Sequence, residues 1–222
     1  PLYSSAASDV YKRQVPAVQD ALFQRLAQNL ISTAPNIFPE EDSLSALVCG
    51  SKSPLPHPTR AETCVMIKAG EETFIFDVGN KSIDNLRNWR VPLNQLNSIF
   101  ISHLHSDHIA ELPEIHMWNW VGTGRQSKLK VYGPEGINQV LNGFTEAYSL
   151  DWKYRNDHHG DQFAPLKAAG FDGYEITDFS KPVYESNGIV ITAFLVDHKP
   201  IDPSLAFKIE YKGRSIVLSG DT

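Results

Sequence analysis

The chain of 222 residues has little cysteine, no long apolar run and no excess of positive charge. Its two cysteines, Cys49 and Cys64, are too few for a disulfide scaffold or a cysteine-rich zinc ribbon. They can pair with each other, but two reduced, packed thiols are the favoured interpretation. No run of about 18 apolar residues occurs, so we expect no membrane span in this stretch. The formal net charge of −6 argues against a nucleic-acid coat, which needs clustered basic residues.

The overall composition, 41% hydrophobic and 21% charged, is typical of a globular protein with a buried core. Residues 1–14 have no apolar period and resemble translated sequencing-adaptor tails, so we expect them to lie outside the fold. Residues 15–43 are predicted to form a helix and a linker. The helix is indicated by Val18, Leu22, Leu26 and Leu30, which are four residues apart, and it is expected to end at Pro35.

Residues 44–222 alternate between strand and helix patterns, which predicts one α/β layered domain. Strands are expected at 44–49, 63–68, 73–78, 96–102, 129–132, 189–196, 205–211 and 215–219, with a short one at 174–177. Helices are expected at 83–89, 109–120 and 134–148. The stretch 149–183 is polar and rich in turn-forming residues, so little other regular structure is expected there. Because the sequence stops directly after a strand, the domain is expected to be truncated after residue 222.

Three of the eight histidines lie within six residues, directly after the strand expected at 96–102. His103 and His105 are two residues apart, and Asp107 and His108 follow where a helix is expected to begin. Zinc takes imidazole nitrogens and carboxylate oxygens, usually four around one ion. Four such side chains in six positions cannot all serve one tetrahedral ion, so the spacing favours two adjacent metals.

This His-x-His-x-Asp-His run is similar to the signature of the metallo-β-lactamase-fold hydrolases. The resemblance extends, in the same order, to the glycine turn at 49–54, to Asp77-Val78-Gly79, to His198 at a strand end and to Gly220-Asp221-Thr222. It implies a four-layer αββα sandwich whose C-terminal part is missing here. The motifs look most like the ribonuclease Z and arylsulfatase-like branch. Because no cysteine follows Cys64, the β-lactamases with a cysteine ligand fit less well.

The resemblance implies two zinc ions, with manganese or iron as alternatives. It assigns His103, His105 and His198 to one ion. It assigns Asp107 and His108 to the other, with Asp221 bridging both and a further histidine expected downstream. A hydroxide held between the metals would attack a phosphorus, sulfur or carbonyl centre. Asp107 would be the catalytic residue that orients or deprotonates this water. Asp77 is either an acceptor for the N–H of a ligand histidine or a plain turn former.

The predicted function is therefore a dinuclear zinc hydrolase, either a ribonuclease Z-like phosphodiesterase or a related phosphate or sulfate ester hydrolase. A lactone or thioester hydrolase of the same fold and a non-catalytic metal-binding module are the alternatives. A small anionic ester is the expected substrate. A tRNA substrate is disfavoured, because His198 and Asp221 are only 23 residues apart and leave no room for a substrate-gripping arm. A homodimer is compatible with the sequence.

Four other positions carry weaker signals. Arg155 and His159, in the polar stretch, are candidate substrate-binding residues that can meet an anionic group. His116, on the helix after the histidine run, is expected to be at the surface or half-buried. Lys52 stands in the glycine turn where the family usually has glycine, which puts the close approach of that loop in doubt.

Overall fold

A computed structural model describes residues 15, 17–19, 21–22, 25–26, 37–39 and 42–222. Residues 17–19, 21–22 and 25–26 are helical, which agrees with the helix predicted after Pro16. The rest of that predicted helix and the adaptor-like segment 1–14 lie outside the described residues. In the described part of the chain, no helix has both the length and the apolar character needed to cross a membrane.

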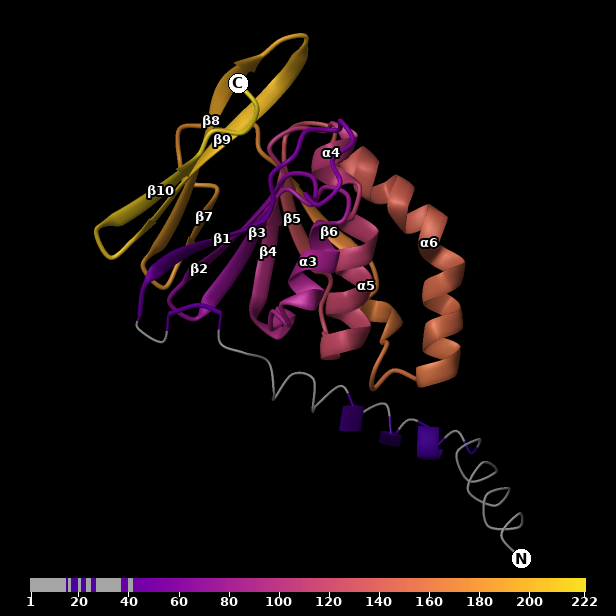
Figure 1. Ribbon diagram of the computed structural model, residues 1–222. Coiled ribbons are helices and arrows are strands. Elements are labelled where there is room, and N and C mark those ends of the chain that lie inside the picture. Colours follow the sequence, from indigo (N-terminus) through magenta and orange to yellow (C-terminus); the bar gives the residue numbers. More distant parts are fainter. Residues whose placement is uncertain (1–14, 16, 20, 23–24, 27–36, 40–41) are drawn as a thin grey trace, which may run out of the picture.

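The first sheet has six strands in the order β1-β2-β3-β4-β5-β6. They are β1 (Leu44–Gly50), β2 (Cys64–Ala69), β3 (Glu72–Phe76), β4 (Leu96–Phe100), β5 (Leu129–Gly133) and β6 (Phe171–Glu175). Strands β1 to β3 pair antiparallel, whereas β3 to β6 pair parallel. The C-terminal ends of β1 and of β3 to β6 therefore meet at one edge, the upper edge in Figure 1.

The second sheet is antiparallel, in the order β10-β9-β8-β7. It contains β7 (Tyr184–Ser186), β8 (Ile189–His198), β9 (Ile201–Tyr211) and β10 (Arg214–Leu218). Apolar side chains of both sheets, among them Phe74, Phe100 and Phe207, form a buried cluster between them. The Leu205 N–H donates to the Ser102 carbonyl at 2.9 Å, which joins the two sheets at the upper edge.

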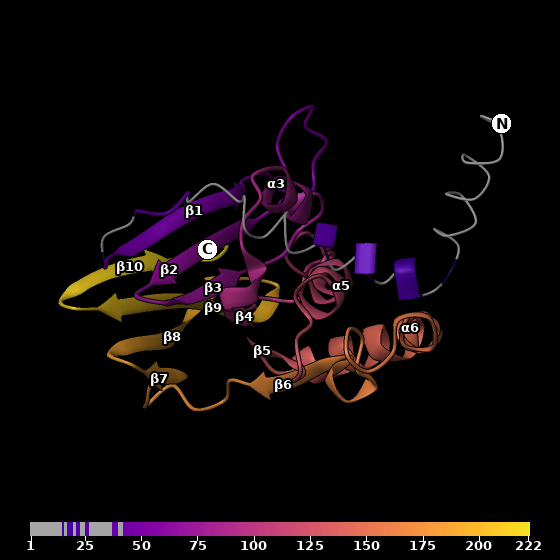
Figure 2. The same ribbon diagram turned by 90° about the horizontal axis from the view of Figure 1, so that it is seen from below.

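Helices cover the other face of the first sheet (Figures 1 and 2). They are α3 (Ser82–Asn88), α4 (Ser106–Ile109), α5 (Leu112–Thr123) and α6 (Ile137–His159), with short 3₁₀ turns at Leu93–Gln95 and Leu166–Ala168. Their apolar residues and those of the sheet form a second core cluster, which includes Ile99, Ile115 and Trp120. The α/β class is confirmed. Of the four expected layers, one helical layer and both sheets lie within the described residues.

Two helix predictions are wrong in their bounds. The helix expected at 109–120 consists of α4 and α5, and α5 starts anew with Pro113 in its first turn. The helix expected at 134–148 runs on to His159, through residues that were predicted to be irregular. Its second half buries only Trp152 and is supported by ion pairs one turn apart, Lys153–Asp157 and Arg155–Asp151.

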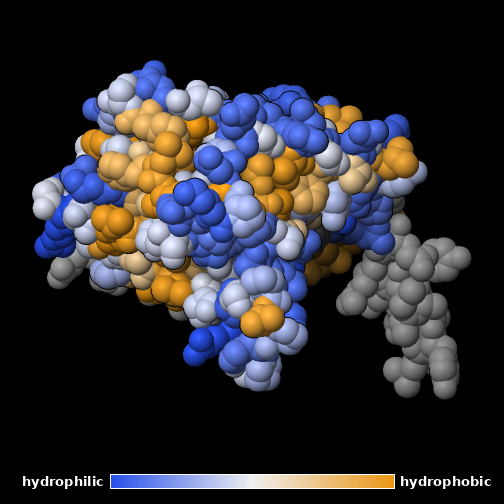
Figure 3. Space-filling model, turned by 90° about the horizontal axis from the view of Figure 1, so that it is seen from above, coloured by the Kyte–Doolittle hydropathy of each residue, from blue (hydrophilic) through white to orange (hydrophobic). Residues whose placement is uncertain are grey.

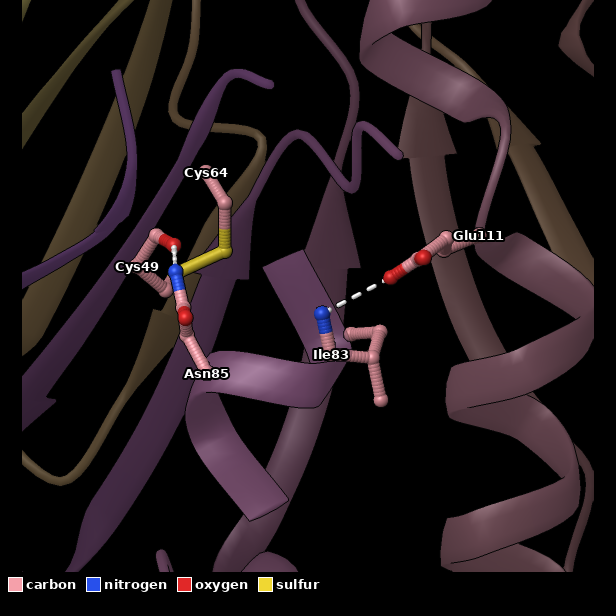
Figure 4. The surroundings of a disulfide bond; sticks show 5 residues. All are labelled: Cys49, Cys64, Ile83, Asn85 and Glu111. Carbon is pink, nitrogen blue, oxygen red and sulfur yellow. Dashed lines mark hydrogen bonds between the residues drawn. A yellow bond between two sulfur atoms is a disulfide. The ribbon is translucent and has the colours of Figure 1, made fainter. Parts of the chain in front are cut away.

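The prediction of reduced cysteines is wrong, because Cys49 and Cys64 form a disulfide (Figure 4). A bulge between Val48 and Gly50 places Cys49 beside Cys64 on the neighbouring strand, with their Cα atoms 5.0 Å apart. The Asn85 side-chain amide of α3 donates to the Cys49 carbonyl at 2.7 Å. The disulfide thus lies at the junction of β1, β2 and α3.

The prediction that His116 lies at the surface or is half-buried is also wrong. The side chain is 1% exposed and lies between Trp120 and Trp152. The Gly170 N–H donates to its Nε2 at 2.8 Å, so that nitrogen carries no proton. Burial lowers the pKa of His116 to about 4. The residue is a neutral part of the core under α6.

Candidate metal centre

Residues from both sheets converge at the upper edge of the molecule. His103, His105, Asp107 and His108 follow β4, at the point where the chain turns into α4. His198 is the last residue of β8, and Asp221 comes three residues after the end of β10. Because β8 and β10 run in the same direction, these two residues reach the same edge as the histidine run. Parallel strand ends explain why segments far apart in sequence meet here.

The first group of ligand-type side chains is His103, His105 and His198, whose ligand atoms all lie within 4.8 Å of one another. His103 Nε2 and His105 Nδ1 are 2.9 Å apart. Burial and the neighbouring histidines lower the pKa of His103 to about 3, which keeps its ring neutral, the form that binds a metal. The Nε2 atom of His198 is buried and has no hydrogen-bond partner among the described residues. Three converging imidazoles, one with an unpartnered nitrogen, fit a zinc ion.

The second group is His103, His108 and Asp221, also within 4.8 Å. His108 is fully buried, and its Nε2 has no hydrogen-bond partner in the part of the chain that the structure describes. That nitrogen lies 3.7 Å from Asp221 Oδ2 and 3.7 Å from Asp107 Oδ2. Asp107 is thus adjacent to this group without being one of its three members. The unpartnered nitrogen among carboxylates fits a second cation, with His103 between the two groups.

Asp77, directly after β3, holds His108 in place. Its carboxylate accepts the Nδ1–H of His108 at 2.9 Å and both the N–H and the hydroxyl of Ser102 at 2.8 Å. Burial lowers the pKa of His108, but the hydrogen bond and charge of Asp77 outweigh it, so the net pKa is raised. Of the two interpretations of Asp77, the structure supports the acceptor role: the proton is fixed on Nδ1 and Nε2 faces the centre.

Close backbone contacts bring the carboxylates to the histidines. A Cβ on Gly79 would lie 2.1 Å from the Asp107 carbonyl oxygen. Gly220 has a φ of 63°, and a Cβ there would lie 2.5 Å from the Leu205 carbonyl oxygen. Only glycine fits these approaches, which place Asp77 and Asp221 beside His108.

Arg155 and His159 are not brought to this centre. Helix α6 begins beside the histidine run, where Gly136 packs against Leu104. Arg155 is 18 residues further along the helix, about 27 Å at a rise of 1.5 Å per residue. Figure 1 shows this end of α6 at the opposite edge of the molecule. Arg155 pairs with Asp151 at 2.9 Å, and the ring of His159 meets that of His158 edge to face. The predicted substrate-binding role is not supported, because the helix extends past the predicted end.

The sequence prediction missed two contributors. Ser102 is the last residue of the predicted strand, and its position directly before His103 is a signal that it lies at the centre. The sequence pattern marks Lys52 only as a departure from the usual glycine and does not indicate its partner Glu62, with which it forms a 2.7 Å ion pair. The surface around this edge, seen from above in Figure 3, carries hydrophilic and hydrophobic patches side by side.

Comparison with known proteins identifies related chains. Residues 47–222 match the family described as Anti-Pycsar protein Apyc1. The ribonuclease Z of Mycobacterium marinum is 34% identical over 175 residues, which are 78% of this chain and 61% of that protein. The ribonuclease Z of Mycobacterium bovis is 33% identical over 181 residues, 81% of this chain and 63% of that protein. The chain thus spans about three fifths of the length of these relatives.

Solved structures share the fold. Human tRNase Z, short form, superposes with a TM-score of 0.62 at 22% identity, covering 79% of this chain and 68% of that one. The metallo-β-lactamase fold protein YhfI from Bacillus subtilis gives a TM-score of 0.60 at 19% identity, covering 82% and 64%. With the family match over most of its length, the chain belongs to the Anti-Pycsar protein Apyc1 family, in the ribonuclease Z branch of the metallo-β-lactamase superfamily.

Proposed function

We propose that the protein is a metal-dependent phosphodiesterase with two adjacent zinc positions. The observation that carries the proposal is the pair of ligand groups that share His103. Each group contains a buried imidazole nitrogen that finds no hydrogen-bond partner within the described residues, His198 Nε2 in one and His108 Nε2 in the other. Unpartnered buried nitrogens are costly unless a cation binds there.

The residues of the proposed site have two roles: most would bind the metal ions, and one would accept a proton. His103, His105 and His198 would hold one ion, and His108 with Asp221 the other. Bound zinc supplies Lewis-acid stabilisation of charge on the substrate oxygen and lowers the pKa of a water molecule. Asp107 is buried beside His108, so its carboxylate is placed to orient this water and accept its proton. Asp77 keeps His108 in the tautomer that leaves Nε2 free.

The substrate that we propose is a small anionic phosphodiester. Relatives named ribonuclease Z support phosphodiester chemistry. The segment between His198 and Asp221 consists of β9, β10 and a tight turn at Lys212-Gly213, so no arm for gripping tRNA lies between them. The net charge of −6 also disfavours a polyanion as large as tRNA.

The test is zinc content and hydrolysis of an aryl phosphodiester by the purified protein. We expect about two zinc ions per chain, and an activity that falls at least about 100-fold in Asp107→Ala, as for loss of a general base. Asp172→Ala, an exposed aspartate on β6, is the matched control and keeps full activity. Activity in zinc-free protein would refute the proposal. Lactone or thioester hydrolysis without phosphodiester hydrolysis would favour the first alternative, and zinc binding without any hydrolysis the second.

A further inference from the structure

The loop between β1 and β2 projects from the molecule beside α3 (Figure 2). It leaves the sheet at the same edge as the metal centre, and its residue Leu55 is 73% exposed. Two interactions join the two ends of the loop. The one at the sheet is the disulfide of Cys49 and Cys64. The one further into the loop is the ion pair of Lys52 and Glu62, whose side chains are only 11% and 10% exposed.

Glu62 also binds the turn that follows β3. Its second carboxylate oxygen accepts the Asn80 N–H at 2.9 Å, and its own N–H donates to the Asn80 carbonyl at 3.0 Å. Gly79 is wedged between Glu62 and Asp107: a Cβ on Gly79 would lie 2.4 Å from Glu62 Cβ and 2.1 Å from the Asp107 carbonyl oxygen. Any shift of Glu62 must therefore move this turn.

The same turn holds one of the two ligand groups. The Val78 N–H donates to the His108 carbonyl at 2.8 Å, and the Asp77 carboxylate accepts the Nδ1–H of His108 at 2.9 Å. Among the described residues, no hydrogen bond joins the turn 77–80 to His105 or His198. The constraint therefore reaches His108 directly, whereas it reaches the first group only at the shared His103, through Ser102.

We propose that Lys52 and Glu62 are positioning residues for the second metal position. Lys52 neutralises the charge of Glu62. The Glu62 carboxylate can therefore stay buried near the metal centre without being a metal ligand. Glu62 fixes the turn 77–80, and the turn fixes His108 and the backbone of Asp107. The inference rests on the proposed metal centre, but it concerns residues that are not ligands. Lys52, the departure from the usual glycine, thereby acquires a role.

The test uses the double variant Lys52→Met/Glu62→Gln. It removes both charges and keeps both chain lengths, so no uncompensated charge stays buried. The control is Lys153→Met/Asp157→Asn, an exposed pair on α6. In zinc-free protein, the downfield Nδ1–H resonance of His108 is followed by ¹H–¹⁵N NMR. We expect the resonance to shift or disappear in the double variant and to stay unchanged in the control.

Zinc titration against a chromophoric chelator gives the second measurement. We expect one of the two zinc affinities, which we assign to the position of His108, to fall about 10- to 100-fold and the other to change less than about twofold. An unchanged His108 resonance, or an equal loss of both affinities, would overturn the inference. Wild-type protein that binds fewer than two zinc ions would contradict the proposed function. The His108 resonance, measured without zinc, would still decide the role of Lys52 and Glu62.

Discussion

Replacing Asp77 by Asn perturbs the metal centre without changing a ligand. Asp77 has a φ of 59°, a left-handed conformation that Asn adopts nearly as readily, so the backbone is not the cause of any effect. One carboxylate oxygen accepts the Ser102 N–H, and the other accepts the Ser102 hydroxyl and the His108 Nδ1–H. An amide offers one acceptor and one donor in their place.

Either orientation of the amide loses interactions. With its NH₂ toward His108, the imidazole must move its proton to Nε2, the atom that faces the centre. With its NH₂ toward the Ser102 N–H, a buried backbone donor loses its acceptor. A hydrogen bond to a charged group contributes about 1.5–3 kcal/mol, so we expect Asp77→Asn to lower the free energy of unfolding by about 3 kcal/mol. We also expect zinc affinity to fall about 10- to 100-fold at the position of His108.

Urea unfolding of zinc-free protein and a zinc competition titration measure the two effects. Ser102→Ala is the matched control, because it removes the hydroxyl and leaves Asp77 bonded to His108. Its loss of zinc affinity should be clearly smaller. If Asp77→Asn binds both zinc ions within about twofold of wild type, the argument that Asp77 fixes the tautomer of His108 is wrong.

Two further predictions concern stability, and a third concerns zinc binding. Replacing both cysteines by serine should lower the free energy of unfolding by about 3 kcal/mol, the chain-entropy value for the 15-residue separation, and a loss under about 1 kcal/mol in urea would contradict this. The His116 pKa of about 4 lies below its unfolded value of 6.5, so the unfolded chain binds a proton first as the pH drops. The free energy of unfolding should therefore fall by up to about 3 kcal/mol between pH 6.5 and pH 4. Across this range the urea midpoint should fall more for wild type than for His116→Leu. Gly79→Ala should abolish zinc binding, because its Cβ would lie 2.1 Å from the Asp107 carbonyl oxygen. Gly143→Ala, whose Cβ would have no described atom within 4 Å, should retain zinc binding in the same titration.

The sequence predicted the part of the centre that is local. His103, His105, Asp107 and His108 lie in one short run after a strand with a clear apolar pattern, and the structure brings them together. His198 and Asp221 could be added only through the family resemblance. They follow His103 by 95 and 118 positions, and no local spacing predicts that residues so far apart are neighbours. The topology of the two sheets brings them together.

The failures have physical causes that a linear pattern does not display. The second half of α6 buries one side chain, Trp152, so it has no apolar period to detect. The disulfide depends on the register and bulge of β1 against β2, which the composition does not reveal. His116 is buried because α6 and β6 cover a helix face that, in sequence, carries a polar residue.

The junction of the two sheets at the Ser102 carbonyl has a consequence for the order of assembly. One sheet supplies His103 and His108, and the other supplies His198 and Asp221, so neither sheet alone offers a complete ligand group. Contacts this distant in sequence form late and slowly in folding. Binding of the proposed zinc ion would therefore require that the two sheets have docked, and the bound ion would stabilise the protein against their separation.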